Sequence, residues 1–355
     1  MDAPRRIGPS RDKVRGMMVG VGIGDALGMP VEGYSAQRIR RDHPEGIRTY
    51  LSGDGHKLWH GTPRGTTTDD TAFTKVVMRS LIEAGGLDID SQAAYHVAAR
   101  GMPGGMGRNT KEALDRLAVG ISWRESGKVG LENRGAGNGV VMKMAPIAAL
   151  MAVDPSRISN RAIVEFSAMT HYSRISARAS VVHASVLREC LSRTPFDLLG
   201  SADAYSPMRD LVDLASRLSR LDQLAGNSSE AYAIDHLDIG DKDISMPLRD
   251  LRLVLDDGMD GEAVARRFHD GNGFLVYYNL PFAYAHFLID PYSIETLYRV
   301  VGAGGDTDSN ASVVGGMLGA LHGLGFFQDH LKDGLRDYAE LIELADGFCE
   351  RFGVD

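Results

Sequence analysis

Cysteine is scarce: Cys190 and Cys349 are the two among 355 residues. They stand far apart in amphipathic runs, which argues against a disulfide framework and against a thiolate zinc site. The N-terminal segment carries charges with no apolar run behind them, so it does not resemble a secretory signal peptide. No stretch approaches the about 18 consecutive apolar residues of a membrane span. These absences predict a cytoplasmic protein without a membrane partner.

Basic residues are outnumbered, with 39 Lys and Arg against 47 Asp and Glu and a formal net charge of −8. A nucleic-acid-binding protein normally shows a basic surplus or a clustered basic stripe. The longest basic run, at 38–41, is interpreted as a solvated helix face. We therefore do not expect nucleic acid as a partner.

Alternating β-branched runs of strand length are also scarce, whereas helical spacing of apolar residues is common. Apolar stripes with this spacing cover 71–84, about 141–151, 174–192, 208–224, 293–302, 309–322 and 331–350. The sequence therefore predicts an all-α fold. No linker divides the chain and no period of 20–50 residues repeats, so we expect one domain over 1–355, with the polar stretch at about 195–246 as an insertion.

Glycine is abundant for a helical chain, at 42 residues, although each one inside a helix costs about 1 kcal/mol relative to Ala. The run from Gly20 to Gly28 superficially resembles a dinucleotide-binding fingerprint, but that motif requires a preceding hydrophobic strand. The preceding residues 11–15 are charged and helical in pattern. We therefore predict a closely packed helix that carries Asp25 and ends before Pro30, with Glu32 just beyond its end.

Two acidic clusters directly precede apolar helices, at 66–71 (TTTDDT) and at 304–310 (GGDTDSN). Thr and Asp are ordinary helix N-caps, but a cap needs one such residue, and adjacent carboxylates repel unless a cation or proton lies between them. The second cluster is not a twelve-residue calcium loop, because it lacks the final Glu. No Cys/His cluster suits zinc. The two clusters with Glu32 predict an oxygen-rich site for one or two Mg²⁺-like ions.

The sequence resembles the ADP-ribosylglycohydrolase family. The matching segments are GDALGMPVE (24–32), TTTDDT (66–71), NGVVMKMAP (138–146), MTHYS (169–173) and GGDTDSNA (304–311). They occur in the family's order and span about 14–325. Their combination is specific, although some are weak individually.

The resemblance implies a compact, single-domain orthogonal helical bundle with a dinuclear cleft for two Mg²⁺ ions, or Mn²⁺. The implied metal ligands are Thr68, Asp69, Asp70, Asp306, Asp308 and Ser309. Glu32 matches the family's mobile acidic residue and is a candidate general base. Asp70 and Asp306 are the other implied catalytic residues, and the sequence does not rank Asp306 against Asp308.

Other matches imply contacts with ADP-ribose. The glycine-rich stretch 101–107 is interpreted either as a diphosphate-binding loop, through Gly105 and Gly107, or as an ordinary connection between helices. The remaining implied contacts are Asn138, Gly139, Val141, Met142, His171 and Tyr172. Tyr172 suits either an adenine platform or the core, and Phe274, Tyr277 and Tyr278 offer another aromatic wall. The family commonly has Arg where this chain has Lys143, which leaves the role of that residue open.

The implied function is Mg²⁺-dependent hydrolysis of the glycosidic bond between ADP-ribose and an acceptor. The partners would be an ADP-ribosylated protein or small molecule, with ADP-ribose as product. Two alternatives remain: a non-catalytic ADP-ribose-binding or structural protein, and a hydrolase of another ribosyl conjugate. The first predicts erosion of the acids, but all of them are present.

Overall fold

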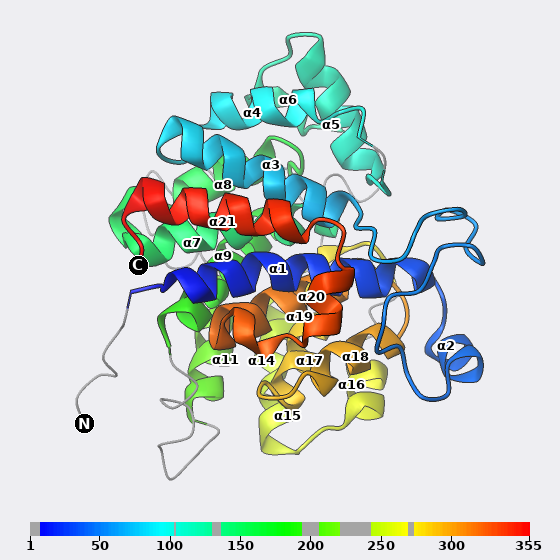
Figure 1. The fold of residues 1–355 in the computed structure, drawn as a ribbon. Coiled ribbons are helices and arrows are strands. Elements are labelled where there is room, and N and C mark those ends of the chain that lie inside the picture. Colours follow the sequence, from blue (N-terminus) through cyan, green and yellow to red (C-terminus); the bar gives the residue numbers. More distant parts are fainter. Residues whose placement is uncertain (1–7, 103, 130–135, 194–205, 221–242, 269–272) are drawn as a thin grey trace.

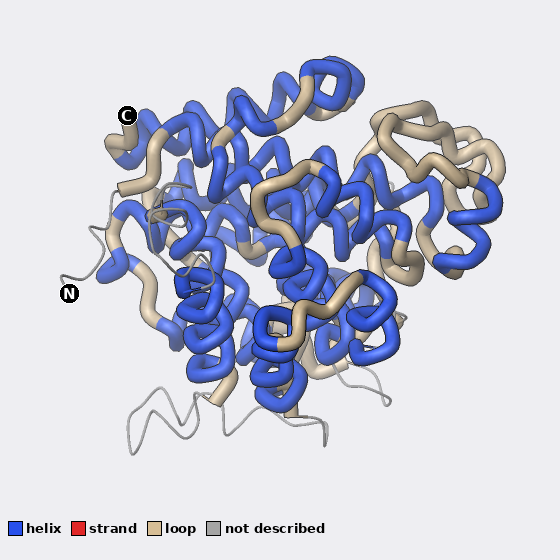
Figure 2. Tube along the Cα trace, turned by 90° about the horizontal axis from the view of Figure 1, so that it is seen from below, coloured by secondary structure: helices blue, strands red, loops and turns tan. Residues whose placement is uncertain are grey.

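The computed structural model describes residues 8–102, 104–129, 136–193, 206–220, 243–268 and 273–355. Within these ranges every regular element is a helix, and two isolated bridges, Ser35 with Gly304 and Gly137 with Leu275, are the β-type pairings. Figure 2 shows helices joined by loops, several of which gather at one side of the molecule. The all-α prediction is confirmed.

Helix α1 (Arg11–Gly28) crosses the middle of the molecule and packs along α19 (Thr307–His322) (Figure 1). A Cβ atom added at Gly20, Gly24 or Gly28 would lie 2.0–2.3 Å from the backbone of α19. The glycine spacing of four therefore lets the two backbones touch along one face. The helices run antiparallel, because Gly16 lies against Gly319 and Gly28 against Thr307. The C-terminal end of α1 consequently meets the N-terminal end of α19.

Helix α3 (Asp69–Ala84) packs against α1 and α21 (Tyr338–Phe352). It leads into α4 (Ile89–Ala98), α5 (Arg108–Ala118) and α6 (Trp123–Ser126), which form the upper part of Figure 1. A small second core lies between α3 and α5 and includes Phe73, Leu114 and Met142. Helix α3 is therefore held between α1 and α21 on one side and this second core on the other.

The central part of the chain forms the other side of the core. The 3₁₀ helix η2 (Asn138–Lys143) is followed by α7 (Ala145–Val153), η3 (Pro155–Arg157), α8 (Asn160–Ala168) and α9 (Arg174–Ser192). Helix α9 covers the same residues as its predicted stripe. The stripe at about 141–151 begins in the 3₁₀ turn of η2 and continues in α7, whose Pro146 stands in the first turn.

The C-terminal part adds shorter helices. They are α14 (Ser245–Asp250), α15 (Arg252–Asp256), α16 (Gly261–Phe268), α17 (Val276–Ile289), α18 (Glu295–Gly302), η5 (Leu324–Phe326) and α20 (Asp329–Gly334). Near the N-terminus, η1 (Met29–Val31) and α2 (Ala36–Asp42) follow α1. The stripe at 331–350 is divided between α20 and α21, because the chain turns after Gly334.

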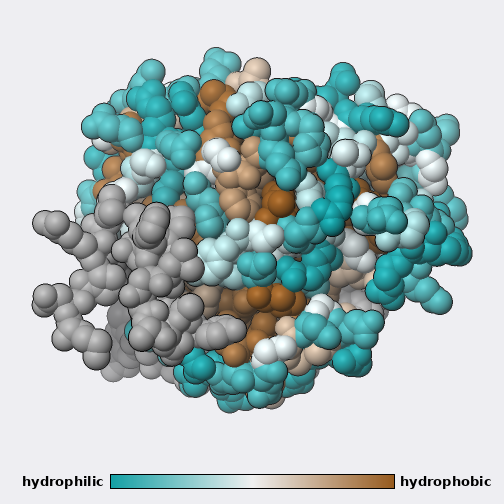
Figure 3. All heavy atoms as spheres, turned by 60° about the horizontal axis from the view of Figure 1, so that its bottom comes forward, coloured by the Kyte–Doolittle hydropathy of each residue, from teal (hydrophilic) through white to brown (hydrophobic). Residues whose placement is uncertain are grey.

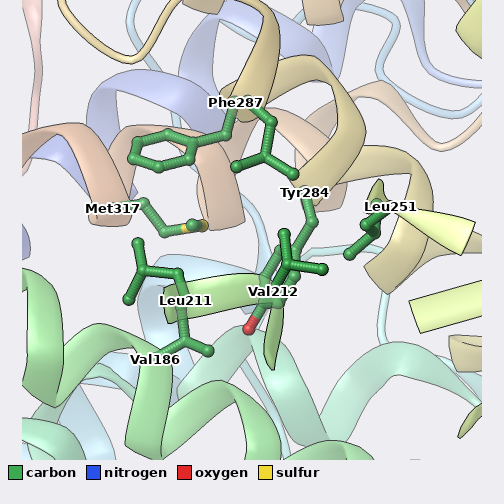
Figure 4. Close-up of a pocket in the computed structure, with 8 residues that line it drawn as sticks. Val186, Leu211, Val212, Leu251, Tyr284, Phe287 and Met317 are labelled. Carbon is green, nitrogen blue, oxygen red and sulfur yellow. The ribbon is translucent and has the colours of Figure 1, made fainter. Parts of the chain in front are cut away.

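Most of the polar stretch at 195–246 lies outside the described residues. Its described part contains α11 (Ser206–Leu218), which packs against α9 and α14 and buries Leu211 and Val212. These side chains line a cavity of about 10 Å³ together with Tyr284 and Met317 (Figure 4). A cavity of that size holds at most one water, so it belongs to the core. That the chain forms a single domain stays a prediction.

Hydrophilic side chains cover most of the face seen in Figure 3, and hydrophobic atoms show mainly in the recesses between them. None of the helices in the described ranges is both long and apolar enough to cross a membrane.

Candidate active site

Three chain segments that are distant in sequence meet at one place: the end of α1, the start of α3 and the start of α19. The fully buried carboxylate of Asp25, in the last turns of α1, joins the first two. It accepts hydrogen bonds from the Thr68 amide at 2.9 and 3.0 Å, the Thr71 amide at 3.1 Å and the Thr71 hydroxyl at 2.5 Å. Asp25 thus satisfies amides of the α3 N-terminus that a helix leaves unpaired.

Two hydroxyl groups hold α19 in the same place. The Thr307 hydroxyl donates to the carbonyl oxygen of Gly28 at 2.7 Å, which connects α19 to α1. The Ser309 hydroxyl donates to Oδ2 of Asp70 at 3.2 Å, which connects α19 to α3. The predicted acidic clusters are therefore neighbours, and the positive ends of both helix dipoles face the carboxylates.

Three carboxylates converge at this junction. Glu32, which follows η1, and Asp306 and Asp308, at the start of α19, each place one oxygen within 4.8 Å of the other two. Burial and the charge of Asp306 raise the pKa of Glu32 to about 7. Burial and the charge of Glu32 raise the pKa of Asp308 well above its ordinary value. A cation between these groups would relieve their repulsion.

The acids of α3 extend the cluster. Burial and the charge of Asp25 raise the pKa of Asp69 to about 7 and the pKa of Asp70 well above its ordinary value. Thr68, 1% exposed, is the N-cap of α3, and its hydroxyl accepts from the Asp70 amide at 3.4 Å. Asp69 and Asp70 of the first cluster thus lie near enough to Asp306 of the second for its charge to act on them.

The donor set fits hard cations such as Mg²⁺. Oδ1 of Asp70 and Oδ1 of Asp308 are buried without a hydrogen-bond partner among the described residues. Buried charged oxygens normally have partners, and carboxylate and hydroxyl oxygens are the ligands that Mg²⁺ and Mn²⁺ prefer. Orphaned oxygens on two different helices are what a cation-binding site would provide.

Asp306 has a different environment from Asp308. Its Oδ2 accepts from the side-chain amides of Asn138 at 2.6 Å and Asn279 at 2.7 Å. Both amides are buried with it, and they oppose the effect of burial, which on balance raises its pKa. One oxygen of Asp306 is therefore occupied by the protein, whereas Asp308 has a free one.

Glu32 is held by an indole. Its Oε2 accepts from Nε1 of Trp59 at 2.7 Å, and its carbonyl oxygen lies 2.8 Å from Nε2 of His56. Trp59 belongs to the long loop between α2 and α3. The ring also approaches the glycine stretch, since a Cβ at Gly105 would lie 3.0 Å from it and 3.6 Å from Oδ1 of Asp69.

The glycine stretch 101–107 therefore lies beside the acids, with Pro103 outside the described residues. Gly104 has φ +133° and lies against the first turn of α3, a conformation and an approach that favour glycine. Gly107 is the N-cap of α5. The structure brings Gly105 near the acidic cluster, and the proposed diphosphate contacts of Gly105 and Gly107 stay predictions.

The segment 136–143 approaches the site from the other side. Its backbone bonds to the start of α17, from the Asn138 amide to Phe274 O and from the Val276 amide to Ala136 O, both at 3.0 Å. Asn138 reaches Asp306 as described. Val141 and Met142 are 2% and 5% exposed, so their side chains belong to the core. Their carbonyl oxygens accept from the Met144 amide and the Thr74 hydroxyl, both at 3.1 Å, and their contacts with a ligand stay predictions.

His171 and Tyr172 follow α8. The His171 ring lies against Gly137 and Gly139, where added Cβ atoms would approach it to 3.2–3.3 Å. Tyr172 is half-buried, with Nζ of Lys128 over its ring at 4.8 Å. Phe274, an alternative aromatic surface, is 61% exposed.

Sequence reasoning missed three supporting residues. Asp25 was noticed in its glycine helix but not as the acceptor for α3. Asn279 is a lone amide in the apolar helix α17, and that isolation was an available signal. Nothing in the sequence pairs Trp59 with Glu32, because that hydrogen bond joins residues 27 positions apart through a loop.

The fold and the site define an all-helical protein whose acidic centre is built at the N-termini of two helices. A family model described as ADP-ribosylglycohydrolase matches residues 8–355. The chain belongs to the ADP-ribosylglycohydrolase family.

Among its relatives, an uncharacterized protein of Archaeoglobus fulgidus is 26% identical over 344 residues, covering 96% of each chain. The ADP-ribosyl-[dinitrogen reductase] glycohydrolase of Rhodospirillum rubrum is 30% identical over 144 residues, covering 40% of this chain and 46% of the relative. The ADP-ribosylarginine hydrolase Tri1 of Serratia proteamaculans is 28% identical over 146 residues, covering 39% and 36%.

A solved structure titled ADP-ribosylglycohydrolase-related protein complex superposes with a TM-score of 0.61 at 23% identity, covering 96% of this chain and 98% of that one. At that identity the likeness shows the fold alone.

Proposed function

We propose that the protein is a hydrolase that cleaves the glycosidic bond between ADP-ribose and an acceptor, with two Mg²⁺ or Mn²⁺ ions as cofactors. The observation that carries the proposal is the convergence of Glu32, Asp306 and Asp308, beside the orphaned oxygens of Asp70 and Asp308. Family membership and the names of the two partial relatives support ADP-ribosyl conjugates as substrates.

Two helix starts would supply the metal ligands. They are Thr68, Asp69 and Asp70 from α3, and Asp306, Asp308 and Ser309 from α19. When bound, the ions would polarise ribose hydroxyl groups and stabilise negative charge that develops during bond cleavage. The side-chain amides of Asn138 and Asn279 hold Oδ2 of Asp306, and its second oxygen would be the metal ligand.

Glu32 would act on the water. In the overall reaction the bond between C1″ and the acceptor breaks, and its electron pair leaves with the acceptor. A water oxygen bonds to C1″ and loses a proton, which Glu32 accepts. The departing acceptor takes up a proton from water, and Glu32 later returns its own proton to water, so that the free acceptor and ADP-ribose are the products. Trp59 holds one oxygen of Glu32 and leaves the other for the water. A carboxylate beside cations stays ionised, which suits a base.

The ligand would extend from this centre between the stretch 104–107 and the segment 137–142. Gly105 adjoins Asp69, and Asn138 adjoins Asp306, so both segments border the acids. Backbone amides of these segments suit a diphosphate, except those of Met106 and Asn138, which donate to Gly104 O and Phe274 O. Other groups of the substrate would then reach His171 and Tyr172.

The test is incubation with arginine- and serine-ADP-ribosylated proteins, with Mg²⁺ or with EDTA, while free ADP-ribose is measured. We expect release in Mg²⁺ and loss of release in EDTA, and the acceptor that reacts identifies the linkage. Binding of ADP-ribose without turnover of either substrate would instead favour a non-catalytic binder. Absence of both binding and turnover would favour another ribosyl conjugate.

Glu32→Gln separates the roles of the acids. It should keep the fold and ADP-ribose affinity but lose about 10²–10⁴-fold in turnover, the usual effect of removing a general base. Glu350→Gln, on an exposed position of α21, is the matched control and should retain activity. Wild-type turnover by Glu32→Gln would refute the assignment of the base.

A further inference from the structure

A line of polar side chains crosses the core next to Gly137 and Gly139. It consists of His96 in α4, Lys143 at the end of η2, and Thr170 and His171 after α8, and their exposed fractions are 0%, 0%, 0% and 2%. Nζ of Lys143 lies 3.2 Å from both Nε2 of His96 and Oγ1 of Thr170. Figure 1 shows α4 and α8 on the same side of α1.

The direction of each hydrogen bond follows from the backbone end of the line. Nδ1 of His96 lies 2.7 Å from the carbonyl oxygen of Gln92, which can only accept, so Nδ1 carries the proton. Burial and the nearby Lys143 lower the pKa of His96 well below its ordinary value, so the ring is neutral. Its Nε2 is then an acceptor, and Lys143 donates to it.

The next bond is determined in the same way. Lys143 has at least two N–H donors whether its amine is protonated or neutral, and the second of them is directed to Oγ1 of Thr170. The hydroxyl proton of Thr170 must turn elsewhere, and Nδ1 of His171, at 2.9 Å, is the remaining acceptor among its described contacts. Burial lowers the pKa of His171 to about 3. The ring is neutral, so its single proton is on Nε2.

That proton faces the candidate ligand segment. A Cβ atom added at Gly137 would lie 3.2 Å from Nε2 of His171, and one at Gly139 would lie 3.4 Å from it. Within the described ranges, no protein group is recorded as a hydrogen-bond partner of this nitrogen, and it is not among the buried unpartnered atoms. Two residues without side chains thus lie directly in front of this donor.

We propose that Lys143 and Thr170 are positioning residues that hold His171 in the Nε2–H tautomer, so that the space beside Gly137 and Gly139 selects an acceptor oxygen of the ligand. The choice of ligand rests on the proposed function. In ADP-ribose the oxygen that accepts this hydrogen bond belongs to the diphosphate or to the distal ribose. Lys143 thereby acts on the site without touching the substrate.

The first test reads the tautomer directly and needs neither ligand nor activity. In protein labelled with ¹⁵N-histidine, two-bond ¹H–¹⁵N correlation spectra distinguish protonated from unprotonated ring nitrogens, and His171→Gln identifies the signals. We expect Nδ1 of His171 at the unprotonated position and Nε2 at the protonated one. The Nδ1–H form or an imidazolium would overturn the proposal.

Variants then test the two positioning residues. Thr170→Val and Lys143→Met should each shift the Nδ1 and Nε2 signals of His171 toward one another as the second tautomer becomes populated, whereas Thr170→Ser, which keeps the hydroxyl, should not. The signals of His183, another buried ring whose Nδ1 lies 3.0 Å from the Tyr284 hydroxyl, serve as control for the fold. Unchanged His171 signals in both variants would refute the role of the line.

Calorimetry with ADP-ribose and ADP in Mg²⁺ tests which ligand oxygen accepts the hydrogen bond from Nε2 of His171. Losing one oriented hydrogen bond should weaken binding to Thr170→Val by about five- to tenfold. A loss for both ligands assigns the oxygen to the diphosphate, and a loss for ADP-ribose alone assigns it to the distal ribose. Unchanged affinity for both, with a changed tautomer, would refute the acceptor site. No binding of ADP-ribose to the wild type would refute the proposed function, while the spectra still decide the tautomer.

Discussion

Replacing Gly24 by Ala tests whether the close contact of α1 with α19 builds the site. The new Cβ would lie 2.0 Å from the carbonyl oxygen of Ala311, where ordinary contact begins at 3.4 Å. The two backbones would have to separate locally by about 1.4 Å. Overpacking of this kind typically costs about 1–3 kcal/mol or more, against a gain of about 1 kcal/mol from helix propensity.

We therefore expect Gly24→Ala to lower the free energy of unfolding by up to about 2 kcal/mol in urea titrations, because a backbone oxygen cannot move aside as a side chain can. Gly347→Ala in α21 is the matched control. Its Cβ would make an ordinary 3.6 Å contact with Ile82, so it should gain about 0.5–1 kcal/mol. Equal stability of the two variants would refute the reasoning.

The same substitution should affect the acidic centre, because it displaces the end of α1, and with it Glu32, from the start of α19. Affinity for Mn²⁺, measured by electron paramagnetic resonance, should fall in Gly24→Ala and stay unchanged in Gly347→Ala. Unaltered Mn²⁺ affinity in a destabilised Gly24→Ala would show that the acids are positioned without this contact.

Three further predictions concern single side chains. In EDTA, Asp308→Asn should raise the free energy of unfolding, because burial and the charge of Glu32 raise the pKa of Asp308. The control Asp333→Asn, at an exposed position, should change the free energy of unfolding by less than about 0.5 kcal/mol. Equal effects of the two substitutions would contradict the prediction. Burial lowers the pKa of Lys143 from 10.5 to about 7, so the wild type loses stability as pH falls across that interval, where the folded state resists protonation. In urea titrations, the free energy of unfolding of Lys143→Met minus that of the wild type should therefore increase as the pH is lowered from about 10 to about 7. A difference that does not change with pH would exclude a lowered pKa of Lys143. Tyr172→Ala should weaken ADP-ribose binding by about 1–3 kcal/mol in calorimetry if the ring stacks on adenine, and unchanged affinity would assign Tyr172 to the core.

The sequence alone predicted the helices, because helix formation is written in local periodicity and capping residues. The stripe at 174–192 coincides with α9, and the stripe at 309–322 lies within α19, which begins two residues earlier. The two acidic clusters were recognisable for the same reason, since each immediately precedes an apolar helix. Their resemblance to a family's motifs also predicted the family, which the family model confirms.

What only the tertiary structure decided is which of these local features meet. Asp25 bonds to Thr68 and Thr71 across more than forty residues, and Asn279 reaches Asp306 from another helix. Lys143, whose role the motif left open, proved to be fully buried, with its Nζ between His96 and Thr170. No local pattern records such pairings, because they depend on how glycine-lined helices pack, and a carboxylate, amide or ammonium acquires its role from the partner that packing places beside it.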